Sequence, residues 1–269
     1  MELGYIVWNV NPQIVKLGPL SLRWYGVLFA LGFFIGYLIF QRFFKKENLP
    51  LELLDKLTLY MVIGTVVGAR LGHVFFYDAK YFLSHPIEIL EVWQGGLASH
   101  GAAIGILLAL WLFVRKYKIS YAWLLDHIVI TVALAGCFIR LGNLMNSEIY
   151  GIQTSLPWGF IFERNGEQFP KHPTQIYEAL GYLLIFFILM RLNNKRPAWL
   201  HDGHIFGLFL ILVFAFRFLV EFIKQDQSAF EAHMTLNMGQ ILSIPFVLGG
   251  ALIFYYAGKG AFERRKKQA

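Results

Sequence analysis

The sequence contains a single cysteine, Cys137, which excludes an intramolecular disulfide and any metal site built from several cysteines. Such a residue usually acts as a small apolar side chain. His201 and His204 have a loosely metal-like spacing, but no convincing further ligand stands near them in the sequence. We therefore expect neither a metal site nor a cofactor.

Charged residues are also scarce, at 15% of the chain against 57% hydrophobic residues, and the mean hydropathy is +0.53. Soluble domains are ordinarily less apolar and more charged. Spanning about 30 Å of hydrocarbon takes roughly 20 apolar helical residues, and the sequence offers many such runs. The composition therefore predicts an all-α, polytopic integral membrane protein.

No removable signal peptide is expected either, because residues 1–19 have no basic start followed by a short apolar block and a small-residue cleavage site. We expect the first apolar stretch to be retained. Residues 1–269 are predicted to form a single membrane-embedded domain. Its seven spans are predicted at residues 20–41, 57–76, 96–114, 122–141, 176–192, 204–222 and 241–256.

The basic residues predict an orientation, because short cytoplasmic loops carry the excess of Lys and Arg. The connections after the first, third, fifth and seventh spans hold fifteen of the 24 basic residues, and the opposite side holds five. The N-terminus is therefore expected outside and the C-terminus in the cytoplasm. The net charge of +7 then suits topology and contact with anionic membrane lipid, and no nucleic-acid partner is expected.

The longest connection, residues 142–175, falls on the predicted outer side. It contains several aromatic side chains, namely Trp158, Phe160, Phe162 and Phe169. Connections of this length are usually functional or disordered, and the aromatic content favours a folded, functional segment. We expect residues 142–175 to form a small external cap.

Four arginines remain within or at the ends of the predicted spans: Arg23, Arg70, Arg140 and Arg217. An arginine at mid-bilayer costs about 2.5 to 3.5 kcal/mol on insertion scales, so it usually has a partner or a task. Arg23 and Arg140 stand at outer span ends, and Arg70 and Arg217 lie about 8 to 9 Å deeper. His100, four residues into the third predicted span, is expected at a similar depth.

These arginines allow two interpretations. Arg217 stands four residues before Glu221, and the pair could be a self-satisfied ion pair on a buried face. Arginine's planar fork also binds phosphate in a bidentate manner, which makes a phospholipid head group the natural ligand for the set. A small-anion channel would be expected to place some arginines in the inner half too.

The densest polar run, residues 140–151, reads Arg140-Leu-Gly-Asn-Leu-Met-Asn-Ser-Glu-Ile-Tyr-Gly151. A helix C-cap explains Gly142 but not Asn146 and Glu148. The run strongly resembles the signature of the bacterial prolipoprotein diacylglyceryl transferases. The resemblance extends across the sequence through Trp24-Tyr25-Gly26, Gly95-Gly96, His100-Gly101, His172-Pro173-Thr174-Gln175, Tyr177-Glu178, Phe216-Arg217, Val220-Glu221-Phe222 and Gly239-Gln240-Ile241-Leu242-Ser243-Ile244-Pro245.

The resemblance implies transfer of a diacylglyceryl group from phosphatidylglycerol to the thiol of a lipobox cysteine in a prolipoprotein signal peptide, with release of glycerol phosphate. The site would lie towards the outer leaflet of the bacterial cytoplasmic membrane. By analogy the lipid phosphate would be bound by Arg140 and Arg217, with Tyr25 and His100 in the catalytic surround. The remaining implied substrate-binding residues are Asn143, Asn146, Glu148, Gly151 and Glu221.

The implied chemistry needs no cysteine in the enzyme, because the attacking thiol arrives on the substrate. A thiol has a reference pKa of about 8.5, so a nearby base would help, and His100 could accept its proton. Its alternative interpretation is a hydrogen-bonding residue in helix packing. Lys224 stands where some relatives carry arginine, which keeps the charge but loses the bidentate fork.

Two other classes of function remain compatible with the residues. A lipid or anion transporter could use the same arginines for binding and release, without covalent change to a peptide. A structural or receptor membrane protein could use its buried charges only to fix helix packing, and it would tolerate shape-matched neutral replacements of Arg217 and Glu221 together.

Overall fold

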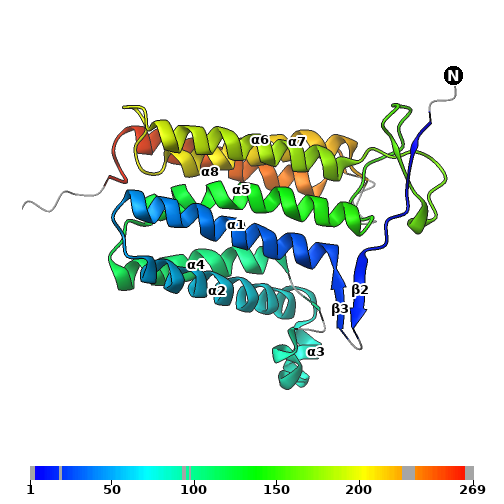
Figure 1. Cartoon of the computed structure of the whole chain (residues 1–269), viewed down its shortest axis with the longest axis horizontal. Helices are drawn as coiled ribbons and strands as arrows, with labels where there is room; N and C mark the ends of the chain where they lie inside the picture. Colours follow the sequence, from blue (N-terminus) through cyan, green and yellow to red (C-terminus); the bar gives the residue numbers. More distant parts are fainter. Residues whose placement is uncertain (1–3, 18–19, 93–94, 97, 226–233, 264–269) are drawn as a thin grey trace, which may run out of the picture. The chain divides into compact units, whose positions relative to one another are not determined.

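The computed structural model describes residues 4–17, 20–92, 95–96, 98–225 and 234–263. Within them the chain is mostly helical (Figure 1). The elements are β1 (Ile6–Trp8), β2 (Gln13–Leu17), β3 (Leu20–Arg23), α1 (Trp24–Lys46), α2 (Leu51–Tyr77), α3 (Ala79–Ser84), η1 (Pro86–Leu90), α4 (Ser99–Tyr117), α5 (Tyr121–Met145), β4 (Phe160–Phe162), η3 (Glu163–Asn165), α6 (Thr174–Lys195), α7 (His204–Val220), η4 (Glu221–Ile223) and α8 (Met238–Gly258). Seven of these helices are long and apolar enough to cross a membrane. The predicted all-α, polytopic fold is confirmed.

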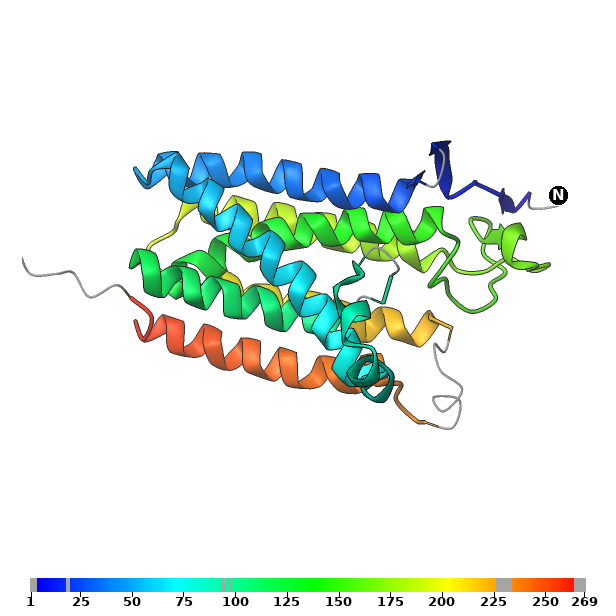
Figure 2. The ribbon, with the colours of Figure 1, turned by 90° about the horizontal axis from the view of Figure 1, so that it is seen from below.

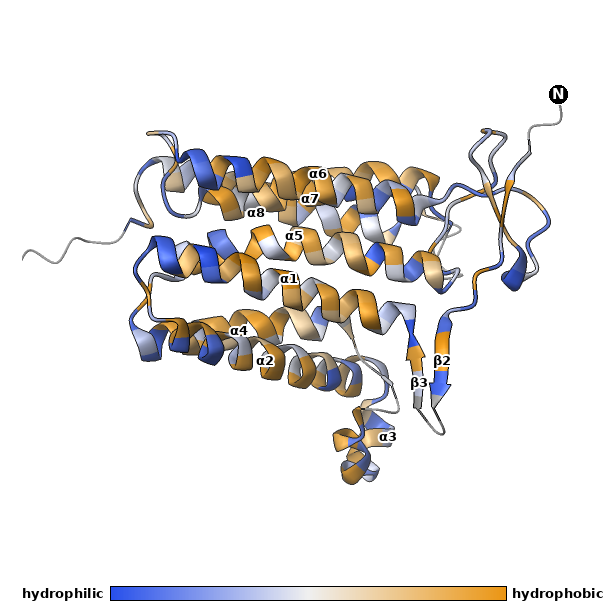
Figure 3. Ribbon diagram, viewed as in Figure 1, coloured by the Kyte–Doolittle hydropathy of each residue, from blue (hydrophilic) through white to orange (hydrophobic). Residues whose placement is uncertain are grey.

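The long helices keep large apolar side chains on their surfaces. Phe34, Leu59, Leu184 and Leu248 are 58 to 62% exposed and belong to four different helices. Figure 3 shows the middle of each long helix as mostly hydrophobic, with hydrophilic residues concentrated near its ends. Lipid acyl chains can cover such a surface, whereas water cannot do so without cost.

The chain divides into two compact units. One contains the residues through Gly36 together with those from Leu125 onward, and the other is residues Tyr37–Leu124. The boundaries fall inside α1 and α5.

In the second unit, α2 and α4 pack against each other (Figure 2). Small residues at four-residue spacing line their contact. A Cβ atom on Gly68 would lie 2.4 Å from the Gly101 carbonyl oxygen, and one on Gly105 would lie 2.1 Å from that of Gly64. Helices in lipid associate largely by such close backbone approach. These glycines therefore set the spacing of α2 and α4.

In the first unit, α7 and α8 pack side by side, with Phe214 stacked on Phe246 at a ring-centroid distance of 4.2 Å. The start of α7 is held by Asp126 on α5, which is 2% exposed. Its two carboxylate oxygens accept from the backbone N–H groups of Gly203 and Phe206, each at 2.8 Å. Asp126 thus satisfies donors that a helix leaves unpaired in its first turn.

The cap predicted at residues 142–175 gains a contribution from the N-terminal segment. Strand β4 pairs in parallel with β1, so that Trp8 is the register partner of Phe162. The Trp8 indole N–H also donates to the Leu144 carbonyl at 3.0 Å. Phe160 and Phe162 form a small buried core with Leu144, whereas Trp158 is 50% exposed. The sequence did not predict this pairing.

Several predicted boundaries are wrong by a few residues. Residues 20–23 are a strand rather than the start of the first span, because Ser21 and Arg23 alternate with leucines and pair with β2. The fourth helix continues to Met145, past its predicted end. The last begins at Met238 because Asn237 and Gln240 form a capping box, in which the Asn237 side chain accepts from the Gln240 N–H.

The glycine contact predicts a sharp difference between two glycine-to-alanine substitutions. Gly105→Ala should lower the free energy of unfolding in detergent by about 1 to 3 kcal/mol, because its Cβ has no room against α2. Gly249→Ala, which has nothing within 4 Å, should be neutral or stabilising. Denaturant or thermal unfolding measures both, and equal effects would contradict the packing described.

Candidate functional site

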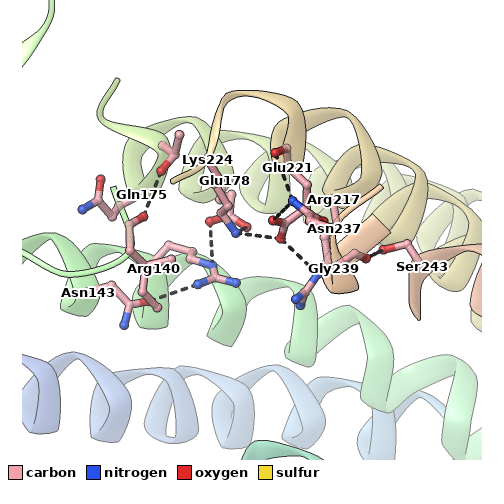
Figure 4. Close-up of polar contacts among 12 residues, drawn as sticks. Arg140, Asn143, Gln175, Glu178, Arg217, Glu221, Lys224, Asn237, Gly239 and Ser243 are labelled. Carbon is pink, nitrogen blue, oxygen red and sulfur yellow. Dashed lines mark hydrogen bonds and ion pairs between the residues drawn. The ribbon is translucent and has the colours of Figure 1, made fainter. Parts of the chain in front are cut away.

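Five charged side chains form a continuous ion-pair network in the first unit (Figure 4). Arg140 Nε lies 3.1 Å from Glu178 Oε2, and the other oxygen of Glu178 lies 3.0 Å from Lys224 Nζ. Lys224 Nζ is also 3.2 Å from Glu221 Oε1, which lies 3.5 Å from Arg217 Nε. Cations and carboxylates therefore alternate, with an arginine at each end.

The middle of the ion-pair network is less accessible than its ends. Side-chain exposure is 0% for Glu178, 2% for Lys224 and 5% for Glu221, but 14% for Arg140 and 34% for Arg217. Burying such charges is tolerable because every carboxylate faces two cations. The two guanidinium groups are the parts that an incoming ligand can reach.

The local fold explains why these charges meet. Arg140 lies five residues before the end of α5, Glu178 is in the first turns of α6, and Arg217 is near the end of α7. Lys224 follows η4 in an extended conformation and bridges to Gly151. A Cβ on Gly151 would lie 2.4 Å from the Ile223 carbonyl oxygen, so Gly151 permits this approach.

Glu221 is fixed from a second direction by the start of α8. The Asn237 side-chain amide donates to Glu221 Oε2 at 3.2 Å and to the Glu221 carbonyl at 3.3 Å. A Cβ on Gly239 would lie 2.5 Å from the Glu221 carboxyl carbon. The carboxylate therefore lies directly over the backbone of the first turn of α8.

The polar run extends the network from Arg140 into the cap. Arg140 Nη1 donates to Asn143 Oδ1 at 3.3 Å, and Asn143 Nδ2 donates to Glu148 Oε1 at 2.7 Å. Asn146 Nδ2 reaches the same carboxylate oxygen at 3.1 Å. Gln175 Nε2 donates to the Glu148 backbone carbonyl at 2.7 Å. These hydrogen bonds hold the polar run in one arrangement beside Arg140.

Tyr25 also belongs to this region, because its ring packs on the backbone of α5. A Cβ on Gly142 would lie 2.7 Å from Tyr25 Cδ2 and 3.3 Å from its Cα. The next turn of α1 places Phe29 in a stacked arrangement with Tyr25, with ring centroids 6.5 Å apart. Gly142, two residues after Arg140, therefore leaves room for the Tyr25 ring to pack on α5.

A cavity of about 400 Å³ adjoins the polar run, lined by Asn146, Ser147, Glu148, Ile149, Tyr150, Asn165 and Gln225. Its lining is mainly uncharged and polar. Two buried atoms there, Asn146 Oδ1 and Ser147 Oγ, have no hydrogen-bond partner within the described part of the chain. Ser147 and Ile149 have positive φ angles of 56° and 61°. Such an angle is unusual for any residue other than glycine, and it is strained for the β-branched Ile149.

Two ionisable groups in the cap have shifted pKa values. Burial raises the pKa of the Tyr150 phenol, whose hydroxyl donates to Glu167 Oε1 at 2.9 Å. Burial lowers the pKa of His172, whose Nδ1 lies 3.3 Å from the Tyr177 hydroxyl. His172 is therefore favoured in its neutral form at neutral pH.

His100 and Arg70 lie in the second unit. His100 is the second residue of α4, which begins at Ser99 and not at residue 96, so it lies nearer the start of the helix than predicted. Gly96, which was expected to begin the third span, has a φ angle of 68° and precedes the helix. The His100 side chain is exposed. Arg70, by contrast, is 5% exposed.

Glu178 was expected only as part of the resemblance, within Tyr177-Glu178, and no role was assigned to it from the sequence. Glu178 and Lys224 are both ionisable residues within or next to predicted spans, which is itself an indication of function. Lys224 was expected to be a poor phosphate ligand, because it lacks the bidentate fork of arginine. In the structure Lys224 is central to the network instead.

Within the described ranges, no group of three or more His, Cys, Asp or Glu side chains is arranged as a metal site. The five ion-paired residues, without the Glu148 carboxylate that lies beyond Asn143, comprise three cations and two carboxylates and so carry one unbalanced positive charge. This arrangement suits a singly charged anion that reaches the arginine ends. A phosphodiester has that charge.

Comparison with known proteins identifies the family of the chain. A family described as prolipoprotein diacylglyceryl transferase matches residues 12–256. Proteins named phosphatidylglycerol–prolipoprotein diacylglyceryl transferase are similar to the chain. The protein of Tolumonas auensis is 50% identical over 255 residues, covering 94% of this chain and 98% of that protein. The protein of Chloroherpeton thalassium is 45% identical over 259 residues, covering 96% of each. The protein of Porphyromonas gingivalis is 44% identical, covering 97% and 98%. With a match over nearly its whole length, this multi-pass membrane protein belongs to the prolipoprotein diacylglyceryl transferase family.

Proposed function

We propose that the chain transfers the diacylglyceryl group of phosphatidylglycerol to the thiol of a lipobox cysteine in prolipoprotein signal peptides. The cysteine sulfur forms a thioether with the glyceryl carbon, the carbon–oxygen bond to phosphate breaks, and glycerol phosphate leaves. The observation that carries this proposal is the ion-pair network, with accessible arginines at its ends and one unbalanced positive charge.

Arg140 and Arg217 bind the phosphodiester of the lipid in this proposal. Their guanidinium groups are fixed by Glu178 and Glu221, which leaves little reorganisation when the ligand arrives. As the carbon–oxygen bond breaks, negative charge grows on the departing phosphate oxygen. Fixed positive charge in a low-dielectric surround stabilises that change more than it stabilises the bound lipid.

The three buried charges between the arginines act as supports. Lys224 holds both carboxylates, so it controls the separation of the two arginine ends without reaching the ligand itself. Asn143, Asn146 and Glu148 fix the polar run beside Arg140. Gly151 contributes through its close packing, which lets the polar run meet Lys224.

The prolipoprotein peptide approaches beneath the cap. The cavity beside the polar run is lined by amides, hydroxyls and one carboxylate, and it has no basic lining residue. Such a lining suits the uncharged amide groups of a peptide main chain better than a phosphate. His100 is proposed to accept the thiol proton, which its exposed position in the first turn of α4 permits.

The site is proposed to face the outer leaflet of a bacterial cytoplasmic membrane, with the N-terminus outside. The excess of basic residues in four connections supports this orientation. The polar run, the start of α6 and the end of α7 all belong to helix ends on the less basic side.

A covalent assay distinguishes the transferase from a transporter. The purified protein, incubated with phosphatidylglycerol vesicles and a lipobox peptide, should add the mass of one diacylglyceryl group to the peptide cysteine. Arg140→Ala should reduce the rate by about a hundredfold or more, because a preorganised charge is lost. The exposed Arg23→Ala serves as control and should keep its activity. No mass gain with the intact protein would exclude the proposed activity.

Cysteine labelling tests the orientation, because the native Cys137 is 7% exposed and should react poorly. Arg164→Cys, in the cap, should be labelled by a membrane-impermeant maleimide in spheroplasts. Lys195→Cys, at the end of α6, should be labelled only after permeabilisation. The reverse pattern would place the cap, and the site beside it, on the cytoplasmic side.

A further inference from the structure

Arg70 on α2 has main-chain partners. Its Nε donates to the Ile89 carbonyl at 2.8 Å, and its Nη2 donates to the Glu88 carbonyl. Its Nη1 donates to the carbonyls of Gly95 at 2.8 Å and Gly96 at 3.3 Å. All three guanidinium nitrogens are thus committed to one connection between α3 and α4.

The aromatic surround of Arg70 completes this arrangement. Its guanidinium carbon lies 4.9 Å from the centroid of the Phe82 ring, and His73 packs edge-to-face on the same ring. Carbonyl dipoles and a ring face stabilise the buried cation. A phosphate could bind Arg70 only by displacing these carbonyls, which would then lose their hydrogen bonds.

The connection held by Arg70 leads directly to His100. Gly96, at a φ of 68°, lies so close that a Cβ would be 2.7 Å from Arg70 Nη1. Two residues later the Ala98 N–H donates to the Ala69 carbonyl at 2.9 Å, on the residue before Arg70. Helix α4 then begins at Ser99.

The backbone is also fixed immediately after His100. A Cβ on Gly101 would lie 2.2 Å from the Gly68 carbonyl oxygen and 2.6 Å from the Gly72 Cα. His100 therefore lies between two contacts with the same stretch of α2, and Arg70 holds the connection that leads into the first of them. Its backbone is held while its side chain remains exposed.

We infer that Arg70 is a positioning residue for His100 and does not bind the lipid phosphate. The inference rests on the proposed function, in which His100 accepts the thiol proton. A general base must be held within hydrogen-bond reach of that proton, and small displacements are costly. Loss of Arg70 should therefore lower kcat and leave the KM for phosphatidylglycerol nearly unchanged.

A double-mutant cycle tests this coupling. In the wild-type background, Arg70→Met should lower kcat by about 10- to 100-fold. In the His100→Gln background the same substitution should lower it by less than about threefold, because the residue it positions is already lost. Arg70→Lys keeps the charge but not the fork that reaches both parts of the connection, so it should resemble Arg70→Met.

Asp126→Asn is the matched structural control. Asp126 is buried and holds the start of α7. Its replacement should change kcat by the same factor in both backgrounds. An equal factor for Arg70→Met in both backgrounds would overturn the inference, as would a raised KM with unchanged kcat. Full activity of His100→Gln would overturn it too, while leaving the transferase activity itself intact.

A second measurement does not depend on activity. Carbethoxylation of His100 by diethyl pyrocarbonate, followed by peptide mass spectrometry, reports the environment of the imidazole in a folded, monodisperse sample. Arg70→Met and Arg70→Lys should change its rate by about threefold or more, because the first turn of α4 is no longer held. Asp126→Asn should leave it unchanged. An unchanged rate in both Arg70 variants would overturn the inference even if the protein showed no transferase activity.

Discussion

The site depends on the buried pairing of two glutamates with three cations. Removing any one of these charges from water is costly, and attraction repays the cost only when each group finds its partners. Glu178 and Glu221 therefore require Arg140, Lys224 and Arg217 to meet at one place. That requirement joins the end of α5, the start of α6 and the segment after α7. Gly151 and Gly239 have no side chain, which allows these segments to approach closely enough for the charges to meet.

The arginines are alike in sequence but differ in their partners. Arg140 and Arg217 pair with carboxylates at the accessible ends of the network. Arg70 is enclosed by the carbonyls of one connection. A depth estimated by counting residues along each helix does not distinguish the three arginines, because it says nothing about which groups their side chains contact. The partners divide them into two proposed ligands and one proposed positioning residue.

The apolar runs predicted all seven helices, since burial in lipid leaves a strong pattern. Their ends were less predictable, because local hydrogen bonds decide them. The Asn237 capping box begins α8 earlier than predicted, and pairing with β2 turns residues 20–23 into a strand. The pairing of β1 with β4 joins segments about 150 residues apart, which no local pattern reveals.

The candidate site was partly predictable for the same reason. Arg140, Asn143 and Glu148 belong to one continuous run, and they do form a connected set. Glu178 and Lys224 come from other elements, and their role emerges only when the helices are packed. An acidic residue within a predicted span was the available indication for Glu178.

The central claim is that the five charges act as one interacting unit, and a cycle on its buried middle tests it most directly. Lys224→Met alone leaves two buried carboxylates without their shared cation and should lower the free energy of unfolding by about 3 to 5 kcal/mol. The double variant Glu178→Gln with Lys224→Met removes one charge of each sign. It should recover a large part of that loss, despite carrying two substitutions. If the loss in the double variant equals the sum of the losses in Lys224→Met and Glu178→Gln measured separately, the account is contradicted.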